Sequence, residues 1–176
     1  MKAWQAALVC CSLMAIAMPA LSDSRETIDA QSREALQRLA AHSADAAGLV
    51  DRAVGVLVFP DLVKVGFGEG SQYGEGVLLV AGEPVGYFAT AGAPFGLALS
   101  AGYKSQVILF MSEPAVAQFR NSHGWEVDVD SEVLLLTAES VGGGYNDQPV
   151  VGFIYTEKGL SDELTFSGGR ITPIAR

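Results

Sequence analysis

Cysteine and histidine are scarce in this chain of 176 residues, and their scarcity excludes several kinds of site. Both cysteines, Cys10 and Cys11, lie within the first 22 residues, so the rest of the chain can form no disulfide. The two histidines, His42 and His123, are isolated from each other in the sequence. A tetrahedral zinc site needs four clustered ligands, mostly Cys or His. We therefore predict neither a metal site nor a cofactor.

The motifs of common enzyme classes are also missing. The chain contains no Gly-x-Ser-x-Gly sequence, the simplest signal of a serine hydrolase. Residues 64–70 are glycine-rich but lack the Gly-Lys-Ser/Thr ending of a phosphate-binding loop, and no helical pattern follows them. Residues 128–132 open like a calcium loop but lack its later glycine and glutamate. The only support for a hydrolase would be Ser, Asp and His residues that belong to no catalytic motif. We therefore predict that the protein is not an enzyme.

Positive charge is in short supply. Eleven Lys and Arg face 20 Asp and Glu, which gives a net charge of −9. This balance argues against a general nucleic-acid binder, because neutralising phosphates needs a basic surface. It also weakens adhesion to anionic membranes by bulk charge. Apolar residues make up 49% of the chain and charged residues 18%, a composition that excludes disorder and predicts one folded domain.

The first 22 residues are typical of a signal peptide. Lys2 supplies a short positive region, residues 6–17 are apolar or small apart from Ser12, and residues 19–22 offer an Ala-x-Ser cleavage site. The apolar stretch is too short for a transmembrane helix, which needs about 20 residues. We therefore expect a signal peptide at 1–22 and a single domain at 23–176.

The same segment predicts where the protein goes. A lipoprotein signal needs small residues just before its cysteine, whereas Leu8 and Val9 precede Cys10. Without a lipid anchor, the cleaved protein is expected to be periplasmic or secreted. Removal of Lys2 leaves 10 basic and 20 acidic residues, so the exported domain would be acidic.

Residues 23 to about 52 have the pattern of an amphipathic helix. Asp23 is the expected N-cap and Glu26 completes a capping box. Gly48 either splits the helix or allows close packing. The apolar stripe consists of Ile28, Ala35, Leu39, Ala46 and Val50. The opposite face carries both signs of charge, whereas a membrane-binding basic helix would carry one. This pattern predicts a helix packed on a core with a solvated outer face.

After residue 53 the chain changes to short apolar runs separated by glycine-rich turns. The runs are residues 54–59, 77–80, 87–90, 107–111, 133–138 and 150–155. They are rich in β-branched and aromatic residues and have the length of strands. One short helix is expected at residues 112–120, with Ser112 as N-cap and Pro114 in the first turn. The prediction is an α+β fold: a mainly antiparallel, barrel-like sheet with an N-terminal amphipathic helix and one short internal helix.

Ten of the 20 glycines lie between residues 66 and 102. Glycines within strands mark bulges, bends or close backbone approach, so the sheet should be glycine-bent. We expect Gly66, Gly68, Gly74 and Gly76 to serve geometry rather than ligand chemistry. A curved sheet can enclose a ligand cavity, but a packed small barrel explains the same glycines equally well.

Three motifs in series resemble the SYLF domain, a lipid-binding domain of eukaryotic endocytic and actin-patch proteins and of exported bacterial proteins. They are Ala-Val-Gly-Val-Leu-Val-Phe-Pro at 53–60, Lys-Val-Gly-Phe-Gly at 64–68 and Tyr-Gly-Glu-Gly at 73–76. The resemblance continues through the apolar run at 107–111 and the segment at 112–120, and covers roughly residues 45 to 160. It implies lipid binding as a class, and neither phosphoinositide nor actin binding in particular.

The leading hypothesis is an exported, non-catalytic lipid-binding domain of the bacterial cell envelope, with a lipid or membrane surface as its partner. Ligand sites of this kind are mostly apolar, with a few polar groups that orient the head group. The candidate lipid-binding residues are Phe67, Tyr73, Tyr87, Phe88, Phe95 and Tyr103, with Lys64 or Lys104 as the cation for the head group. Ordinary core packing is the alternative for each aromatic residue. The alternative function is a structural or protein-interaction module whose apolar loop at 91–97 docks a partner.

Overall fold

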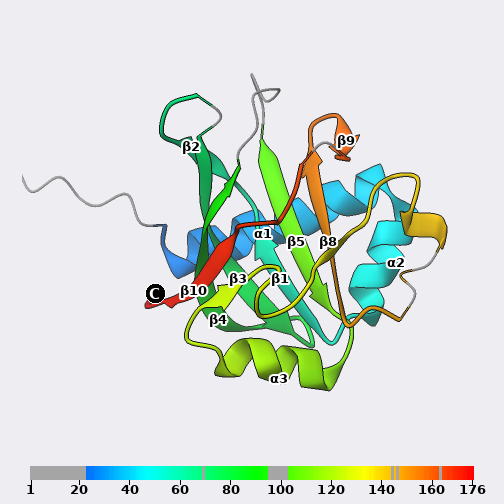
Figure 1. Ribbon diagram of the computed structural model, residues 1–176. Helices are drawn as coiled ribbons and strands as arrows, with labels where there is room; N and C mark the ends of the chain where they lie inside the picture. The colour runs from blue at the N-terminus through cyan, green and yellow to red at the C-terminus, as the bar shows by residue number, and fades with distance from the viewer. Residues whose placement is uncertain (1–22, 69, 95–102, 144, 146, 163) are drawn as a thin grey trace, which may run out of the picture.

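The computed structural model describes residues 23–68, 70–94, 103–143, 145, 147–162 and 164–176. In these ranges the chain has an α+β fold with a curled, barrel-like sheet (Figure 1). The helices are α1 (Arg25–His42), α2 (Ala44–Arg52), α3 (Glu113–Asn121) and the 3-10 turn η1 (Val141–Gly143). The strands are β1 (Gly55–Phe59), β2 (Val63–Val65), β3 (Ser71–Val80), β4 (Glu83–Pro94), β5 (Lys104–Phe110), β6 (Trp125–Glu126), β7 (Leu134–Leu135), β8 (Val150–Thr156), β9 (Gly159–Leu160) and β10 (Arg170–Ile174).

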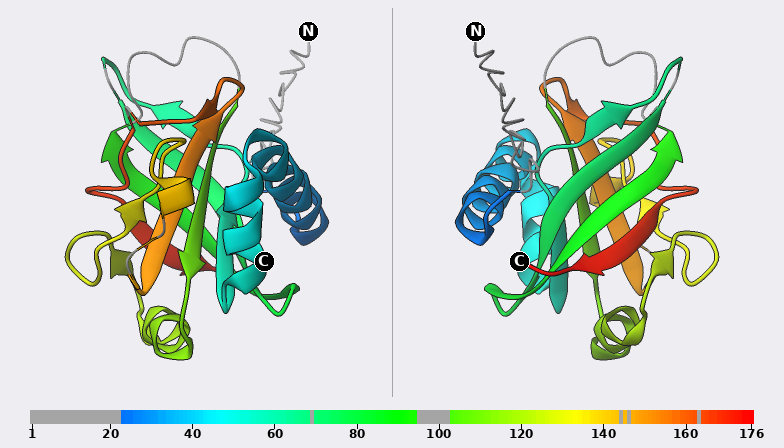
Figure 2. Two further views of the ribbon diagram at one scale, coloured as in Figure 1. Left: turned by 90° about the vertical axis from the view of Figure 1, so that its right-hand side faces the viewer. Right: turned by 90° about the vertical axis from the view of Figure 1, so that its left-hand side faces the viewer.

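The strands form one mixed sheet in the order β6-β10-β4-β3-β1-β5-β8-β7. β2 pairs with the end of β3 beyond β1, and β9 pairs with β8. The pairs of named strands in the described ranges are antiparallel except β7 with β8. The sheet curls into a half-barrel, with α1 and α2 packed on one face and α3 across the lower end of the strands (Figure 2).

Each face of the sheet is packed by its own apolar cluster. Inside the curl, residues from both ends of the strand order meet, such as Ile154 of β8 and Ile171 of β10, together with Phe119 of α3. On the other face, Leu39 of α1 and Leu49 of α2 pack against the sheet. The continuous apolar runs of β1, β5 and β8 follow from this arrangement, because strands covered on both faces alternate between two apolar clusters.

The segment expected to be one helix at 23–52 forms two helices. Ser43 separates them: its backbone ends α1, and its hydroxyl accepts a hydrogen bond from the Ala46 N–H to begin α2. The predicted cap was wrong by one residue, since Ser24 rather than Asp23 caps α1 by accepting from Thr27 N–H. Gly48 lies within α2 and does not split it. None of the helices in the described ranges is long and apolar enough to span a bilayer.

The described part of the curl is filled with side chains where the glycines lie. A methyl group on Gly76 would overlap the Val58 carbonyl oxygen and come within 2.6 Å of the Phe59 ring. On Gly74 it would come within 2.5 Å of Leu62 Cδ2. Phe59 and Leu62 are both buried. These glycines therefore leave room for large side chains, as the packed-barrel interpretation expects.

Candidate functional site

The structure separates the predicted lipid-binding residues that it describes into three places. Lys64, Phe67 and Tyr73 lie together on the β2–β3 hairpin. Tyr87 and Phe88 lie on β4, Tyr103 and Lys104 lie at the start of β5, and Phe95 lies outside the described residues. The hairpin is therefore the place where predicted residues come together at the surface.

The hairpin projects from the end of the sheet, beyond the strands that form the barrel (Figures 1 and 2). Val63 pairs with Tyr73, Lys64 with Gln72 and Val65 with Ser71. Side chains of paired residues share a face of the sheet, so Val63, Val65 and Tyr73 lie on one face. Gly66, with φ of +94°, starts the reversal that places Phe67 at the tip, a backbone conformation that disfavours other residues.

The apolar side chains of this hairpin are exposed to solvent. The exposed fraction is 54% for Val63, 55% for Val65, 38% for Tyr73 and complete for Phe67. We call these four residues the apolar hairpin patch. The two valines are not among the predicted binding residues, because β-branched residues in a strand usually belong to the core. Alternation with Lys64 was the available signal, but it does not reveal that the strand leaves the body of the protein.

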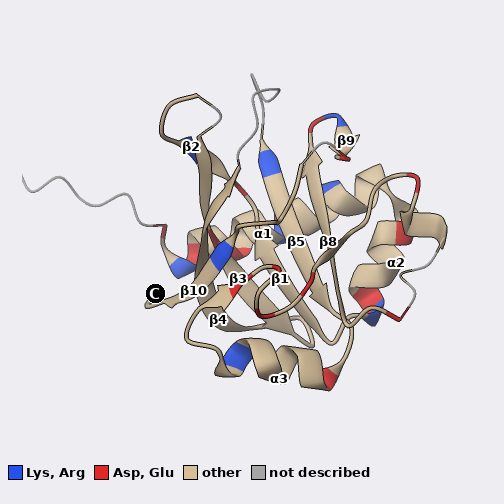
Figure 3. Cartoon of the chain, in the orientation of Figure 1, with Lys and Arg blue, Asp and Glu red and all other residues tan. Residues whose placement is uncertain are grey.

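Lys64 is exposed on the face of β2 opposite Val63 and Val65, and its ammonium donates a hydrogen bond to the Gly68 carbonyl oxygen. This bond closes the hairpin loop and keeps the charge near the tip. Elsewhere the charged residues of both signs are spread over helices, strands and loops (Figure 3). The described residues of the hairpin therefore combine apolar side chains with one cation.

A polar anchor fixes the base of the hairpin. The Tyr73 hydroxyl donates to Glu75 Oε1 at 2.9 Å, and Arg176 pairs with the same carboxylate, with Nε 3.2 Å from Oε2. Burial, together with the hydrogen bond to Glu75, raises the pKa of Tyr73. Since Glu75 and Arg176 are both largely buried, this group holds the C-terminal residue against β3. The anchor gives the exposed patch a defined orientation.

Lys104 faces the inside of the curl, away from the patch. Its side chain is only 1% exposed and donates a 2.8 Å hydrogen bond to Gln72 Oε1. Burial lowers its pKa from 10.5 to about 8, because removing an ammonium from water disfavours the charged form. Gln106, two residues further along β5, has a buried amide nitrogen that finds no hydrogen-bond partner among the described residues. In this packing Lys104 cannot reach a lipid head group at the surface.

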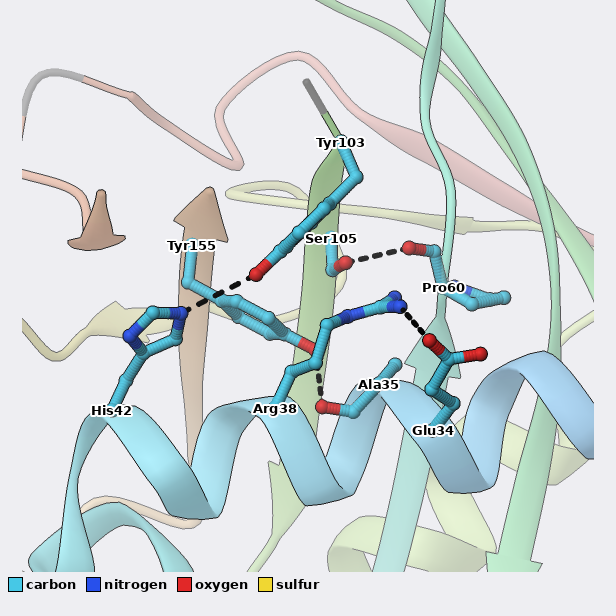
Figure 4. A network of polar contacts seen from close by, with 8 residues as sticks. All are labelled: Glu34, Ala35, Arg38, His42, Pro60, Tyr103, Ser105 and Tyr155. Atoms are coloured by element: carbon cyan, nitrogen blue, oxygen red, sulfur yellow. Dashed lines mark hydrogen bonds and ion pairs between the residues drawn. The ribbon is translucent and has the colours of Figure 1, made fainter. Parts of the chain in front are cut away.

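Tyr103 belongs to a polar network that joins α1 to the sheet (Figure 4). The Arg38 guanidinium lies 4.3 Å from the centre of its ring, and His42 Nε2 lies 3.4 Å from its hydroxyl. Below it, the buried Tyr155 hydroxyl donates to the Ala35 carbonyl oxygen at 2.5 Å. Burial raises the pKa of Tyr155 to about 12. The network holds α1 in place, and nothing in the sequence pattern indicated the roles of Arg38 or Tyr155.

The two β4 aromatics have separate surroundings. The Tyr87 hydroxyl donates to Asp29 on α1 at 3.1 Å, and burial and this bond raise its pKa. Phe88 is 9% exposed, with its ring centre 4.9 Å from that of Phe119, so it belongs to the core. Core packing therefore describes Phe88 better than ligand contact does.

In the described part of the chain, no three His, Cys, Asp or Glu side chains come together to hold a metal ion. Comparison with protein-family models finds no match for this chain. Comparison with curated proteins finds none either. The resemblance to SYLF domains thus rests on the three motifs at 53–60, 64–68 and 73–76, of which the last two lie on the hairpin or directly below it.

Proposed function

We propose that this protein is an exported, non-catalytic lipid-binding domain of the bacterial cell envelope that contacts a membrane surface through the apolar hairpin patch. In this proposal the glycine-bent sheet, covered on one face by the N-terminal amphipathic segment, serves as a rigid support for the β2–β3 hairpin. The observation that carries it is the complete exposure of Phe67 at the tip of a projecting hairpin whose Val63 and Val65 are more than half exposed. Exposed apolar groups gathered in one place are typical of interaction surfaces.

A membrane surface suits the chemistry of this hairpin. Aromatic residues and lysines with apolar stems are favoured at the boundary between lipid and water, where the ring is buried and the charge stays hydrated. Phe67 at the tip would enter the acyl region and Tyr73, nearer the base, would lie at the level of the head groups, to which the flexible Lys64 side chain would extend its ammonium. The packed interior supports contact at the surface over enclosure of a whole lipid.

The energy available from the patch indicates weak, reversible binding. Burying a fully exposed Phe is worth about 2 kcal/mol, and the half-exposed valines add about 1 kcal/mol each. A sum of about 4 kcal/mol corresponds to a dissociation constant near 1 mM. The net charge of −9 adds no general attraction to anionic lipids, so attachment through this hairpin would be transient unless a second contact assists it.

Sedimentation with phosphatidylcholine vesicles tests the proposal. Phe67→Ser should lower the partition coefficient roughly 10- to 50-fold, the equivalent of about 2 kcal/mol, without loss of thermal stability. Val129→Ser is the matched control, because Val129 is 73% exposed on a distant turn. If Phe67→Ser and Val129→Ser sediment as well as the wild type, the hairpin is not the contact site.

Two further outcomes separate the alternatives. With vesicles containing anionic lipid, Lys64→Gln should weaken binding several-fold and flatten its salt dependence, since one cation near a membrane surface is worth about 1 kcal/mol. If no vesicle binds, but cross-linking in intact cells captures a specific protein that Phe67→Ser loses, the hairpin serves the protein-interaction function instead.

A further inference from the structure

A second candidate site lies away from the hairpin, where the end of α3, the start of β4 and the end of β10 meet. These segments line a solvent-open groove with a volume of about 290 Å³. Its lining residues are Leu78, Val85, Gly86, Tyr87, Phe88, Arg120, Ser122, Pro173 and Ile174. The volume is at the lower limit of pockets that hold small organic ligands.

The groove is apolar with one charged side chain. Leu78 and Phe88 are buried and form part of the core, while Val85 is 41% exposed at the wall. Arg120 is exposed in the last turn of α3 and has no ion pair or hydrogen bond within the described residues. Among the residues that the structure describes, no acidic side chain belongs to the lining. An apolar surface with a single unpaired cation is complementary to a short apolar chain that ends in an anion.

The other polar groups of the groove are already engaged. The Ser122 hydroxyl donates to the Phe119 carbonyl oxygen at 2.7 Å, and the Tyr87 hydroxyl donates to Asp29. Pro173 has no N–H to donate from the β10 edge. Arg120 is therefore the lining side chain with donors available to a ligand, and a guanidinium binds a carboxylate through two parallel hydrogen bonds.

We propose that this groove binds a small single-chain amphiphile with a carboxylate head, such as a medium-chain fatty acid. The chain would lie along Val85, Pro173 and Ile174, and the carboxylate would pair with Arg120. This site is separate from the apolar hairpin patch and does not depend on membrane contact.

Titration of the purified, isotope-labelled protein with sodium octanoate, followed by amide NMR, tests the proposal. Octanoate should bind in the roughly millimolar range and shift the amides of Val85, Ser122 and Ile174 while leaving those of the hairpin unchanged. Uncharged octanol should bind about fivefold more weakly, because an exposed ion pair contributes modestly. Shifts spread over the whole surface, or centred on the hairpin, would overturn the assignment.

Single substitutions then test the contribution of the Arg120 charge separately from that of the apolar wall. Arg120→Gln should bring octanoate down to the affinity of octanol, whereas Arg52→Gln should have no effect. Arg52 is a close control, since it is an exposed arginine in the last turn of another nine-residue helix. Val85→Asp should abolish octanoate binding by placing a like charge at the wall.

Two results distinguish this site from the proposed membrane function. Phe67→Ser should lose vesicle binding and keep octanoate binding, and Arg120→Gln should do the reverse. Equal octanoate affinity for the wild type, Arg120→Gln and Arg52→Gln would refute the proposal even if vesicle binding through the hairpin is observed.

Discussion

Raising the pH from 8 to 10 should stabilise this protein, because Lys104 is buried. Its pKa is about 8 in the folded state, against an ordinary value of 10.5. Between these values the unfolded chain binds the proton that the folded chain has released. Stability therefore rises with pH across this window, whereas below pH 8 the cost of burying the ammonium is present in full.

The size of the effect follows from the same two pKa values. Each tenfold change in proton affinity is worth about 1.4 kcal/mol, so integration from pH 8 to pH 10 gives a gain of about 2 kcal/mol. Above pH 10 an opposite effect sets in, because the raised pKa values of Tyr155, Tyr73 and Tyr87 disfavour folding once unfolded tyrosine ionises. The window of rising stability is therefore bounded on both sides.

Urea unfolding of the wild type and Lys104→Met at intervals from pH 7 to pH 10 measures this effect. The slope with pH is the informative quantity, since the substitution also removes the 2.8 Å bond to Gln72 and so changes the stability at every pH. Lys104→Met should lose the increase of about 2 kcal/mol. Lys158→Met, at an exposed lysine, should retain it. Parallel pH profiles for the wild type and Lys104→Met would refute the reasoning.

Elements defined by local signals could be predicted from the sequence. The six apolar runs fall on or overlap β1, β3, β4, β5, β7 and β8, because β-branched residues in short runs bounded by glycines favour strands. The internal helix α3 begins after Ser112, whose hydroxyl accepts from Ala115 N–H, with Pro114 in the first turn as predicted. Caps and prolines act within one turn of helix, so the sequence around them contains the whole signal.

Elements that depend on tertiary pairing could not be predicted. β10 contains Pro173, and a proline argues against a strand. The strand nevertheless pairs with β4 over five residues and with β6 over only two. Most of β10 therefore has an edge without a neighbouring strand, where the missing N–H of proline is tolerated. The break between α1 and α2 at Ser43 was not predicted, because a serine in a helical pattern can equally be a solvent-facing residue, and Gly48 was the only position considered for a break. In both cases distant partners decide the local structure.

Only part of the candidate site could be predicted from the sequence. Phe67, Tyr73 and Lys64 were selected from the glycine-rich motifs, and register brings them together on one hairpin. Lys104 was assigned to a head group because lysines are mostly exposed. Its burial beside Gln72 depends on which face of β5 lies inside the curl, a property of the whole sheet that a single strand does not encode.

Three further substitutions, two of them with a control substitution, test the packing described above. Gly76→Ala should cost more than 2 kcal/mol and lower the melting temperature by several degrees, since its methyl group would overlap the Val58 carbonyl, whereas Gly48→Ala should be neutral or stabilising. Ser43→Ala should cost about 1 kcal/mol in urea unfolding by removing the cap of α2. Tyr155→Phe should also cost about 1 kcal/mol, because it removes the buried hydrogen bond to the Ala35 carbonyl while leaving the ring in place. Tyr103→Phe should cost less, since the Tyr103 hydroxyl is partly exposed and lies 3.4 Å from His42. If the two Tyr→Phe variants unfold at the same urea concentration, the link between Tyr155 and α1 is not what holds that helix against the sheet.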